Sequence, residues 1–445
     1  MSRVTDMTGG NAKRLILKFS LPLILGNLGQ QLYAIVDASI VGRGVGVSAL
    51  ASVGATDWIC WMIIWTVIGL TQGLGTYVSR YFGKRDYKGV NKVITMSTLL
   101  CASVGAVLTL LGIVFARPML ELLKTPEDII DGACLYLVTM VSGTLIVAAY
   151  NMTGAVLRGL GDGRTPLVAM VIAAVTNIGL DLLFVLVFHW GIFGAAVASL
   201  VAQLISFAFC LVRMLKIDFI KLDREAWSLD IKLLKELFVF GIPLAIQYII
   251  ISLGGIILQS TVNLQGSYFI AGYTATNKLY GLLESTAISL GIACSTFVSQ
   301  NYGARNFDRV REGVRSGAVL AVGMAVGILT SVLILGKYLL RLFLDLSEEG
   351  GPEAFAVAYK YLVIMALSLI VLYLIHVYRN ALLSIGNSAW PLYSGIAEFF
   401  IRVSMAKLFT RLIGIDVLYY IEPAAWVGAF VVCLAPWLYY QKRFK

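Results

Sequence analysis

Long apolar runs separated by short polar segments make up this chain from end to end. Most runs are at least as long as the roughly 20 residues that an α-helix needs to cross a bilayer. The pattern predicts twelve membrane-spanning helices, at residues 16–40, 50–78, 90–116, 127–156, 166–188, 192–214, 235–262, 269–297, 311–343, 354–384, 389–413 and 419–440. We therefore expect an all-α integral membrane fold.

The composition supports this class and excludes an ordinary soluble domain. Hydrophobic residues make up 59% of the chain and charged residues 13%, whereas soluble domains are roughly 25% charged. The mean hydropathy is +0.85. A formal net charge of +10 would favour nucleic acid in a soluble chain. Here the basic residues lie between the apolar runs, where membrane topology explains them, so we expect no nucleic-acid partner.

The basic residues are divided unequally between the two sides of the predicted membrane. With both termini on one side, the segments on that side hold about 25 Lys and Arg residues and the opposite loops about 6. Cytoplasmic segments carry this excess in membrane proteins. We therefore expect a multi-pass protein of the cell membrane with both termini in the cytoplasm. The first apolar run is too long for a signal peptide and is expected to remain as the first span.

An internal repeat divides the predicted helices into two sets of six. Three blocks recur in the same order, at offsets of 221, 220 and 225 residues: Ser20–Leu23 with Gly241–Leu244, Gly83–Arg85 with Gly303–Arg305, and Gly161–Pro166 with Gly386–Pro391. Because six is an even number, both halves insert in the same sense and are related by a pseudo-twofold axis along the membrane normal, with a cavity expected between them. We expect lobes at 1–214 and 235–445, joined by a cytoplasmic linker at 215–234.

Two carboxylates in the predicted spans are candidates for function. Asp181 lies about four turns into its helix, and an acid at that depth is costly to keep in a membrane. Asn177 precedes Asp181 by four residues and shares its helix face. Asp37 on the first helix and Ser199 on the sixth lie at a similar depth. At the repeat offsets the second half has only Leu258 and Ala406, so the acid pair has no counterpart there.

We expect two carboxylates in one apolar site to bind one positively charged ligand at a time. Two carboxylates that share such a site lose hydration and repel each other. A proton, a sodium ion or a cationic substrate neutralises them, and these guests exclude one another. If the outward-facing state takes up the ion and so releases the substrate, ion influx drives export. Pro22 is a candidate point for the first helix to bend during such a cycle.

The repeat, Pro22 and two glycine-containing turns, Leu157–Pro166 and Ser299–Ala304, together resemble the multidrug and toxic compound extrusion (MATE) transporters over essentially the whole chain. The resemblance implies a twelve-helix, two-lobe exporter that exchanges H+ or Na+ for organic, often cationic, compounds without ATP. The chain is similar to the DNA-damage-inducible branch, whose amino-terminal lobe binds the coupling cation. That similarity implies the following coupling positions, with a Na+ site at the first three: Asp37, Asn177, Asp181 and Ser199. Tyr136 is a weaker position and is also expected to line the substrate cavity.

Other side chains carry weaker expectations for the substrate cavity. Tyr33 and Trp61 are aromatic residues that would form walls for flat cations, although aromatic residues in spans more often serve packing. Glu284 lies in mid-span and would contact cationic compounds, unless another helix supplies a partner. Glu398 and Arg402 are four residues apart, which favours an ion pair within one helix.

Alternative functions have less support from the sequence. A flippase for lipid-linked sugars would share the topology, but it would need Arg or Lys residues in the cavity to hold pyrophosphate, and the amino-terminal spans contain few. The chain has no HExxH, GxSxG or Walker A motif, and its six cysteines have no CxxC spacing. We therefore expect a monomeric transporter in membrane lipid, with neither enzymatic activity nor a bound cofactor beyond the coupling ion.

Overall fold

The computed structural model describes residues 4–344, 346–347 and 350–444, except for the side chains at positions 32–35, 38, 39, 43, 47 and 50. Tyr33, one of the predicted cavity residues, is among those exceptions. Contacts divide the chain into two compact units. Unit 1 contains residues 1–7 and 25–245, and unit 2 contains residues 8–24 and 246–445. Two long helices, the first and the eighth, therefore each begin in one unit and end in the other.

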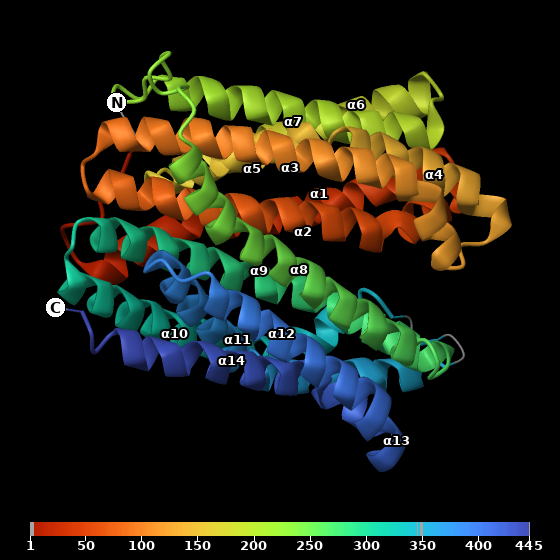
Figure 1. The fold of residues 1–445 in the computed structure, drawn as a ribbon. Helices are drawn as coiled ribbons and strands as arrows, with labels where there is room; N and C mark the ends of the chain where they lie inside the picture. Colours follow the sequence, from red (N-terminus) through yellow and green to blue (C-terminus); the bar gives the residue numbers. More distant parts are fainter. Residues whose placement is uncertain (1–3, 345, 348–349, 445) are drawn as a thin grey trace. The chain divides into compact units, whose positions relative to one another are not determined.

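The first half of the chain forms α1 (Ala12–Gly44), α2 (Val47–Gly83), α3 (Tyr87–Leu122), α4 (Glu127–Ser142), α5 (Thr144–Gly159), α6 (Arg164–Asp181) with a π-helical continuation η1 (Leu182–Val187), and α7 (Gly191–Leu215). The second half forms α8 (Ile231–Val262), α9 (Ser267–Gly303), α10 (Phe307–Leu340), α11 (Gly351–Ser384), α12 (Ala389–Ser404) with π-helical η2 (Met405–Phe409), α13 (Thr410–Ile413), η3 (Ile415–Tyr420) and α14 (Ile421–Tyr440). Figure 1 shows these helices coloured along the chain.

The fold prediction is confirmed: this is an all-helical membrane fold of twelve spans in two sets of six. Of the described residues, nine helices are long and apolar enough to cross a membrane, and the bent pair α4–α5 makes a tenth span. The remaining two are α1, which contains Pro22, and the segment α12–η2–α13. The predicted spans at 166–188 and 389–413 match helices that change from α to π geometry near their ends.

The predicted fourth span is broken, and a glycine explains where. α4 and α5 meet at an angle of 45° with Gly143 between them. A Cβ atom added to Gly143 would collide with the side chain of Leu200 on α7. Glycine at this position lets α7 pack closely against the bend. Hydropathy alone does not show such a break, because both pieces are equally apolar.

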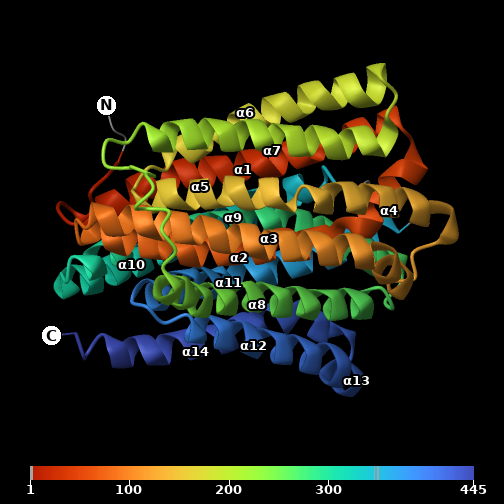
Figure 2. The same ribbon diagram turned by 45° about the horizontal axis from the view of Figure 1, so that its top comes forward.

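Packing within the two units follows the same scheme. In unit 1, α2 packs on α5, α3 on α5, and α6 on α7; in unit 2, α9 packs on α11, α10 on α11, and α12 on α14. Figures 1 and 2 show the α6–α7 pair lying side by side in both views. The helix starts agree as well, since α6 begins at Arg164 and α12 at Ala389, which is the offset of 225 residues found in the sequence.

The predicted glycine-containing turn is a helix cap. Gly161 has φ of +79°, a conformation that favours glycine. Asp162 Oδ1 accepts hydrogen bonds from the backbone N–H groups of Arg164 (3.1 Å) and Thr165 (2.9 Å) at the start of α6. These bonds satisfy donors that a helix leaves free at its amino end. The turn therefore fixes the start of the helix that carries Asn177 and Asp181.

Candidate functional site

The polar face of α6 is buried inside unit 1. Asn177 is 2% exposed and Asp181 is 0% exposed. The two residues are one turn apart, and the π-helical segment η1 begins directly after Asp181. A π turn often accompanies a functional site. Here, however, unit 2 has a π turn at the matching place, η2, so this feature belongs to the repeated fold rather than to the acid site alone.

The structure brings Asp37 and Asp181 together. The two carboxyl groups, one on α1 and one on α6, lie within hydrogen-bonding reach of each other. Two ionised carboxylates are both acceptors, so a hydrogen bond between them requires a proton on one oxygen. Without that proton, Asp37 Oδ1 and both Asp181 carboxylate oxygens are buried with no donor among the described residues. Among the described residues, no cationic side chain is bonded to this pair.

Asn177 adds a third oxygen-bearing group to this set. Its amide nitrogen donates to the Ser199 hydroxyl on α7 at 3.3 Å. That bond turns the amide so that Asn177 Oδ1 is buried without a donor in the described part of the chain. Oxygen atoms from carboxylates, amides and hydroxyls are the ligands of hard cations. The four residues predicted for coupling thus form one acceptor-rich group on α1, α6 and α7.

Tyr136 on α4 lies close enough to this group to interact electrostatically with Asp37 and Asp181. The same tyrosine also interacts with Asp57 on α2, an exposed carboxylate that the sequence analysis did not single out. The sequence could have indicated Asp57, because it is an acid inside the apolar run 50–78. No cluster of three or more His, Cys, Asp or Glu side chains suited to a metal occurs among the described residues. Any ion here would therefore depend on two carboxylates with amide and hydroxyl support.

Trp61 is not joined to the acid pair by any contact that the structure records. Its side chain is 47% exposed and stacks on Trp65, with ring centroids 6.0 Å apart. An exposed indole ring stacked on a half-buried one fits either a substrate wall or a lipid-facing surface. The role of Trp61 therefore stays a prediction.

Unit 2 contains a chain of largely buried ion pairs. Arg402 contacts Glu398 at 3.2 Å, which confirms the predicted pair within α12. Two further members were missed: Arg379 on α11 pairs with Glu398 at 2.5 Å, and Glu422 on α14 pairs with Arg402 at 2.8 Å. Both missed residues are single charges near apolar runs, so the sequence offered a signal without a partner. Their two positive and two negative charges cancel.

Glu284 lies beside this network without an ion pair of its own in the described residues. Its carboxylate hydrogen-bonds the hydroxyl of Tyr280, one turn earlier on α9, and interacts electrostatically with Arg402 and Glu422. Glu284 is therefore an additional acid next to a network that is already neutral. This placement leaves both expectations open, a contact for cationic compounds or a purely structural acid.

Comparisons with known proteins all point to one family of membrane proteins. A model of the MatE family matches residues 22–183 and 243–408. The probable multidrug resistance protein YpnP of Bacillus subtilis (strain 168) is 30% identical over 360 residues, covering 80% of this chain and 79% of that protein. The probable multidrug resistance protein YoeA of the same organism is 28% identical over 428 residues, covering 94% and 90%.

Solved structures agree on the fold. The chain is similar to a crystal structure of MATE in the bent conformation, with a TM-score of 0.88 and 20% identity over 100% of this chain and 98% of that one. It is also similar to an outward-facing multidrug resistance MATE transporter of the MOP superfamily, with a TM-score of 0.88 and 21% identity over 99% and 98%.

Proposed function

Because the chain belongs to the MatE family of multidrug efflux transporters, we propose that it exports small organic compounds, often cationic, in exchange for H+ or Na+. We place the exchange at Asp37, Asn177, Asp181 and Ser199 in unit 1. The observation that carries the proposal is the group of buried oxygens of Asp37, Asn177 and Asp181 that have no donor among the described residues. The names of the relatives, which include probable multidrug resistance proteins, support the substrate class.

The chemistry of the group supports exchange of one guest for another. An ionised carboxylate pair in a desolvated place is unfavourable, and a bound positive charge relieves both the repulsion and the lost hydration. A proton would bridge the two carboxyl groups. A sodium ion would use the same oxygens, with Asn177 Oδ1 as a further ligand. Either guest neutralises the pair, so the binding of one opposes the binding of another, and the two gradients become linked.

The proposal includes the orientation of the chain in the membrane. We place the protein in the cell membrane with both termini in the cytoplasm and the chain acting as a monomer. The excess of Lys and Arg on the proposed cytoplasmic side supports this orientation. Trp61 and Glu284 are secondary candidates for contacting an organic cation, since an indole face and a carboxylate both attract positive charge.

The flippase alternative has little support in the structure. Holding a pyrophosphate would need basic side chains that are free to bind it. Arg402 and the largely buried Arg379 are both bound to glutamates in unit 2. Releasing Arg402 would leave Glu422 without the arginine that it now contacts, and breaking a desolvated ion pair in this way is costly.

The decisive experiment measures efflux of ethidium, a fluorescent organic cation, in inverted membrane vesicles. Three conditions are compared: a proton gradient alone, a sodium gradient alone, and neither. We expect transport under one gradient and none without a gradient. Transport at equal rates in all three conditions would contradict ion exchange.

Asp37→Asn tests the site itself, with Glu121→Gln as the matched control because Glu121 is an exposed carboxylate on α3 paired with Arg117 at 3.2 Å. We expect the first variant to lose gradient-driven efflux and the second to keep it. Full activity in Asp37→Asn would remove Asp37 from the mechanism. Scrambling of a labelled polyprenyl pyrophosphate lipid by the wild type would favour the flippase instead.

A further inference from the structure

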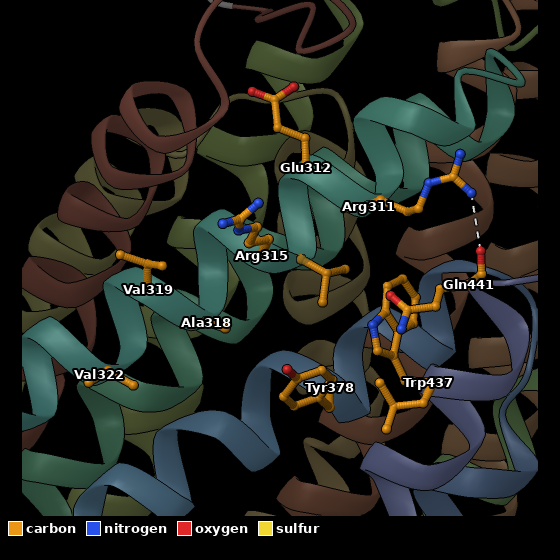
Figure 3. Close-up of a pocket in the computed structure, with 11 residues that line it drawn as sticks. Arg311, Glu312, Arg315, Ala318, Val319, Val322, Tyr378, Trp437 and Gln441 are labelled. Atoms are coloured by element: carbon orange, nitrogen blue, oxygen red, sulfur yellow. Dashed lines mark hydrogen bonds between the residues drawn. The ribbon is translucent and has the colours of Figure 1, made fainter.

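A groove lies on unit 2 near the end of α10 that follows the α9–α10 turn. Its volume is about 700 Å³. Figure 3 shows Arg315, Val319 and Val322 along α10 on one side, with Tyr378 of α11 and Trp437 of α14 on the other. No residue of this groove belongs to the acid site or to the ion-pair network. Its position and chemistry therefore need a separate explanation.

The groove lies at the level where lipid headgroups meet the hydrocarbon. Residues 316–336 of α10 contain no Asp, Glu, Lys or Arg. At 1.5 Å per residue this stretch spans about 31 Å, close to the roughly 30 Å of a bilayer core. Arg315 stands directly at one end of the stretch and Lys337 at the other. Trp437 lines the groove at the same end, as aromatic residues do at membrane interfaces.

Arg315 is the available positive charge in the groove. Arg311 is already engaged, because its guanidinium donates to the backbone oxygen of Gln441 at 3.1 Å and pairs with Asp308 at 2.6 Å. Glu312 at the rim pairs with Arg309 at 3.6 Å. Arg315 is exposed and makes no ion pair or hydrogen bond with the described residues. Below it, Val319 and Val322 are 50% and 38% exposed.

The matching place in unit 1 is covered by the chain itself. At the repeat offset of 220, Arg311 corresponds to Asn91 and Arg315 to Thr95. Asn91 donates to the backbone oxygen of Phe219 at 3.0 Å, as Arg311 does to that of Phe444 at 3.4 Å. The two units differ at the next position along the groove, Thr95 in unit 1 and Arg315 in unit 2.

In unit 1 the linker continues over α3, where the Thr95 hydroxyl donates to the Ala226 backbone oxygen at 2.6 Å. In unit 2 no described segment continues over Arg315. The linker therefore covers the surface of α3 in unit 1 that corresponds to the groove on α10 in unit 2.

We propose that the unit 2 groove binds an anionic phospholipid, with the phosphate on the Arg315 guanidinium and an acyl chain along Val319, Val322 and Leu438. A guanidinium matches the geometry of a phosphate and is well suited to hold it. The exposed valines lie at the depth where acyl chains are the surrounding solvent. A cation above an apolar channel therefore complements a lipid that has an anionic head and an apolar tail.

Native mass spectrometry of the purified full chain in detergent tests this inference. Dioleoyl phosphatidylglycerol is compared with dioleoyl phosphatidylcholine at equal concentration. We expect the wild type to retain more of the anionic lipid. Arg315→Gln should weaken phosphatidylglycerol binding about five-fold, the effect of one basic residue near a membrane surface. Arg315→Lys, which keeps the charge, should retain most of the preference.

Two further variants separate this groove from general attraction to charge. Arg224→Gln removes an equal charge from an exposed position on the linker and should leave binding unchanged. Ala318→Trp fills the groove without altering charge and should lower binding. Size-exclusion profiles establish that each variant is folded.

The proposal is overturned if Arg315→Gln binds phosphatidylglycerol as the wild type does, or if Arg224→Gln loses binding equally. It is also overturned if the two lipids bind the wild type alike, or if a second copy of the chain occupies the groove and excludes lipid. None of these readouts depends on transport.

Discussion

The two halves of this protein share a packing scheme but neutralise buried charge in opposite ways. At the offset of 225 residues, Asn177 and Asp181 of unit 1 correspond to Arg402 and Ala406 of unit 2. In unit 1, Asp37 Oδ1 and both carboxylate oxygens of Asp181 have no donor among the described residues. In unit 2 the acids Glu398 and Glu422 are bound to a resident arginine.

This difference concerns how each unit neutralises the charge that it removes from water. A charge removed from water must be neutralised, because its desolvation is otherwise too costly. In unit 2, Glu398 and Glu422 are neutralised by the arginines that they contact, Arg379 and Arg402. In unit 1 we propose that a bound cation neutralises Asp37 and Asp181. The repeated backbone provides two equivalent positions, and a few side chains determine whether the buried charge there has a partner within the protein.

The largest expected effect comes from Asp181→Asn. The amide keeps the shape of the side chain but removes the charge that attracts the ion, so gradient-driven ethidium efflux should fall by about 100-fold. The folded protein should remain at least as stable, because the repulsion from Asp37 is lost. Vesicle transport and thermal unfolding in detergent measure the two quantities. Undiminished transport would contradict the proposed site.

Breaking the unit 2 network should act on stability instead. Glu398→Gln leaves Arg379 buried without its carboxylate partner and should destabilise the protein by about 3–5 kcal/mol. Unfolding in detergent measures this loss. Adding Arg379→Gln should recover part of it, since the uncompensated charge is removed. A loss below about 1 kcal/mol for Glu398→Gln, the range of an exposed pair, would show that the network is not desolvated.

A smaller effect is expected from Ser199→Ala. The Asn177 amide loses the acceptor that it now has at 3.3 Å. An unsatisfied buried donor costs about 1 kcal/mol or more, so the ion concentration for half-maximal efflux should rise about five-fold. Ser206→Ala is a suitable control, because the Ser206 hydroxyl donates to the Ala169 backbone oxygen on the same pair of helices. An equal shift in both variants would indicate a packing effect.

The smallest effect is expected from moving the carboxylate to unit 2, which should not restore the efflux lost in Asp181→Asn. Ala406→Asp places a carboxylate at the unit 2 position equivalent to Asp181. In the Asp181→Asn background it should restore no coupled efflux, because Arg402, about one turn away, would neutralise the new acid. Efflux is measured as before. Recovery of gradient-driven transport would mean that the fold position, rather than the surrounding charge, defines the coupling site.

Much of this picture was encoded in local sequence. Apolar runs of sufficient length determine membrane spans whatever the spans pack against, and the recurring turns around Gly161 and Gly386 identify the repeat. The spacing of four between Asn177 and Asp181, and between Glu398 and Arg402, places each pair on one helix face by geometry alone. These features depend only on neighbours along the chain.

Contacts between distant segments required the tertiary structure. Only the packing of α1 against α6 brings Asp37 to Asp181, and only α11 and α14 bring Arg379 and Glu422 to the glutamate and arginine of α12. The break at Gly143 likewise depends on Leu200 from another helix. Hydropathy reports how apolar a segment is, but not which helix faces it. Whether a buried charge is neutralised within the protein or awaits a guest is therefore decided by packing.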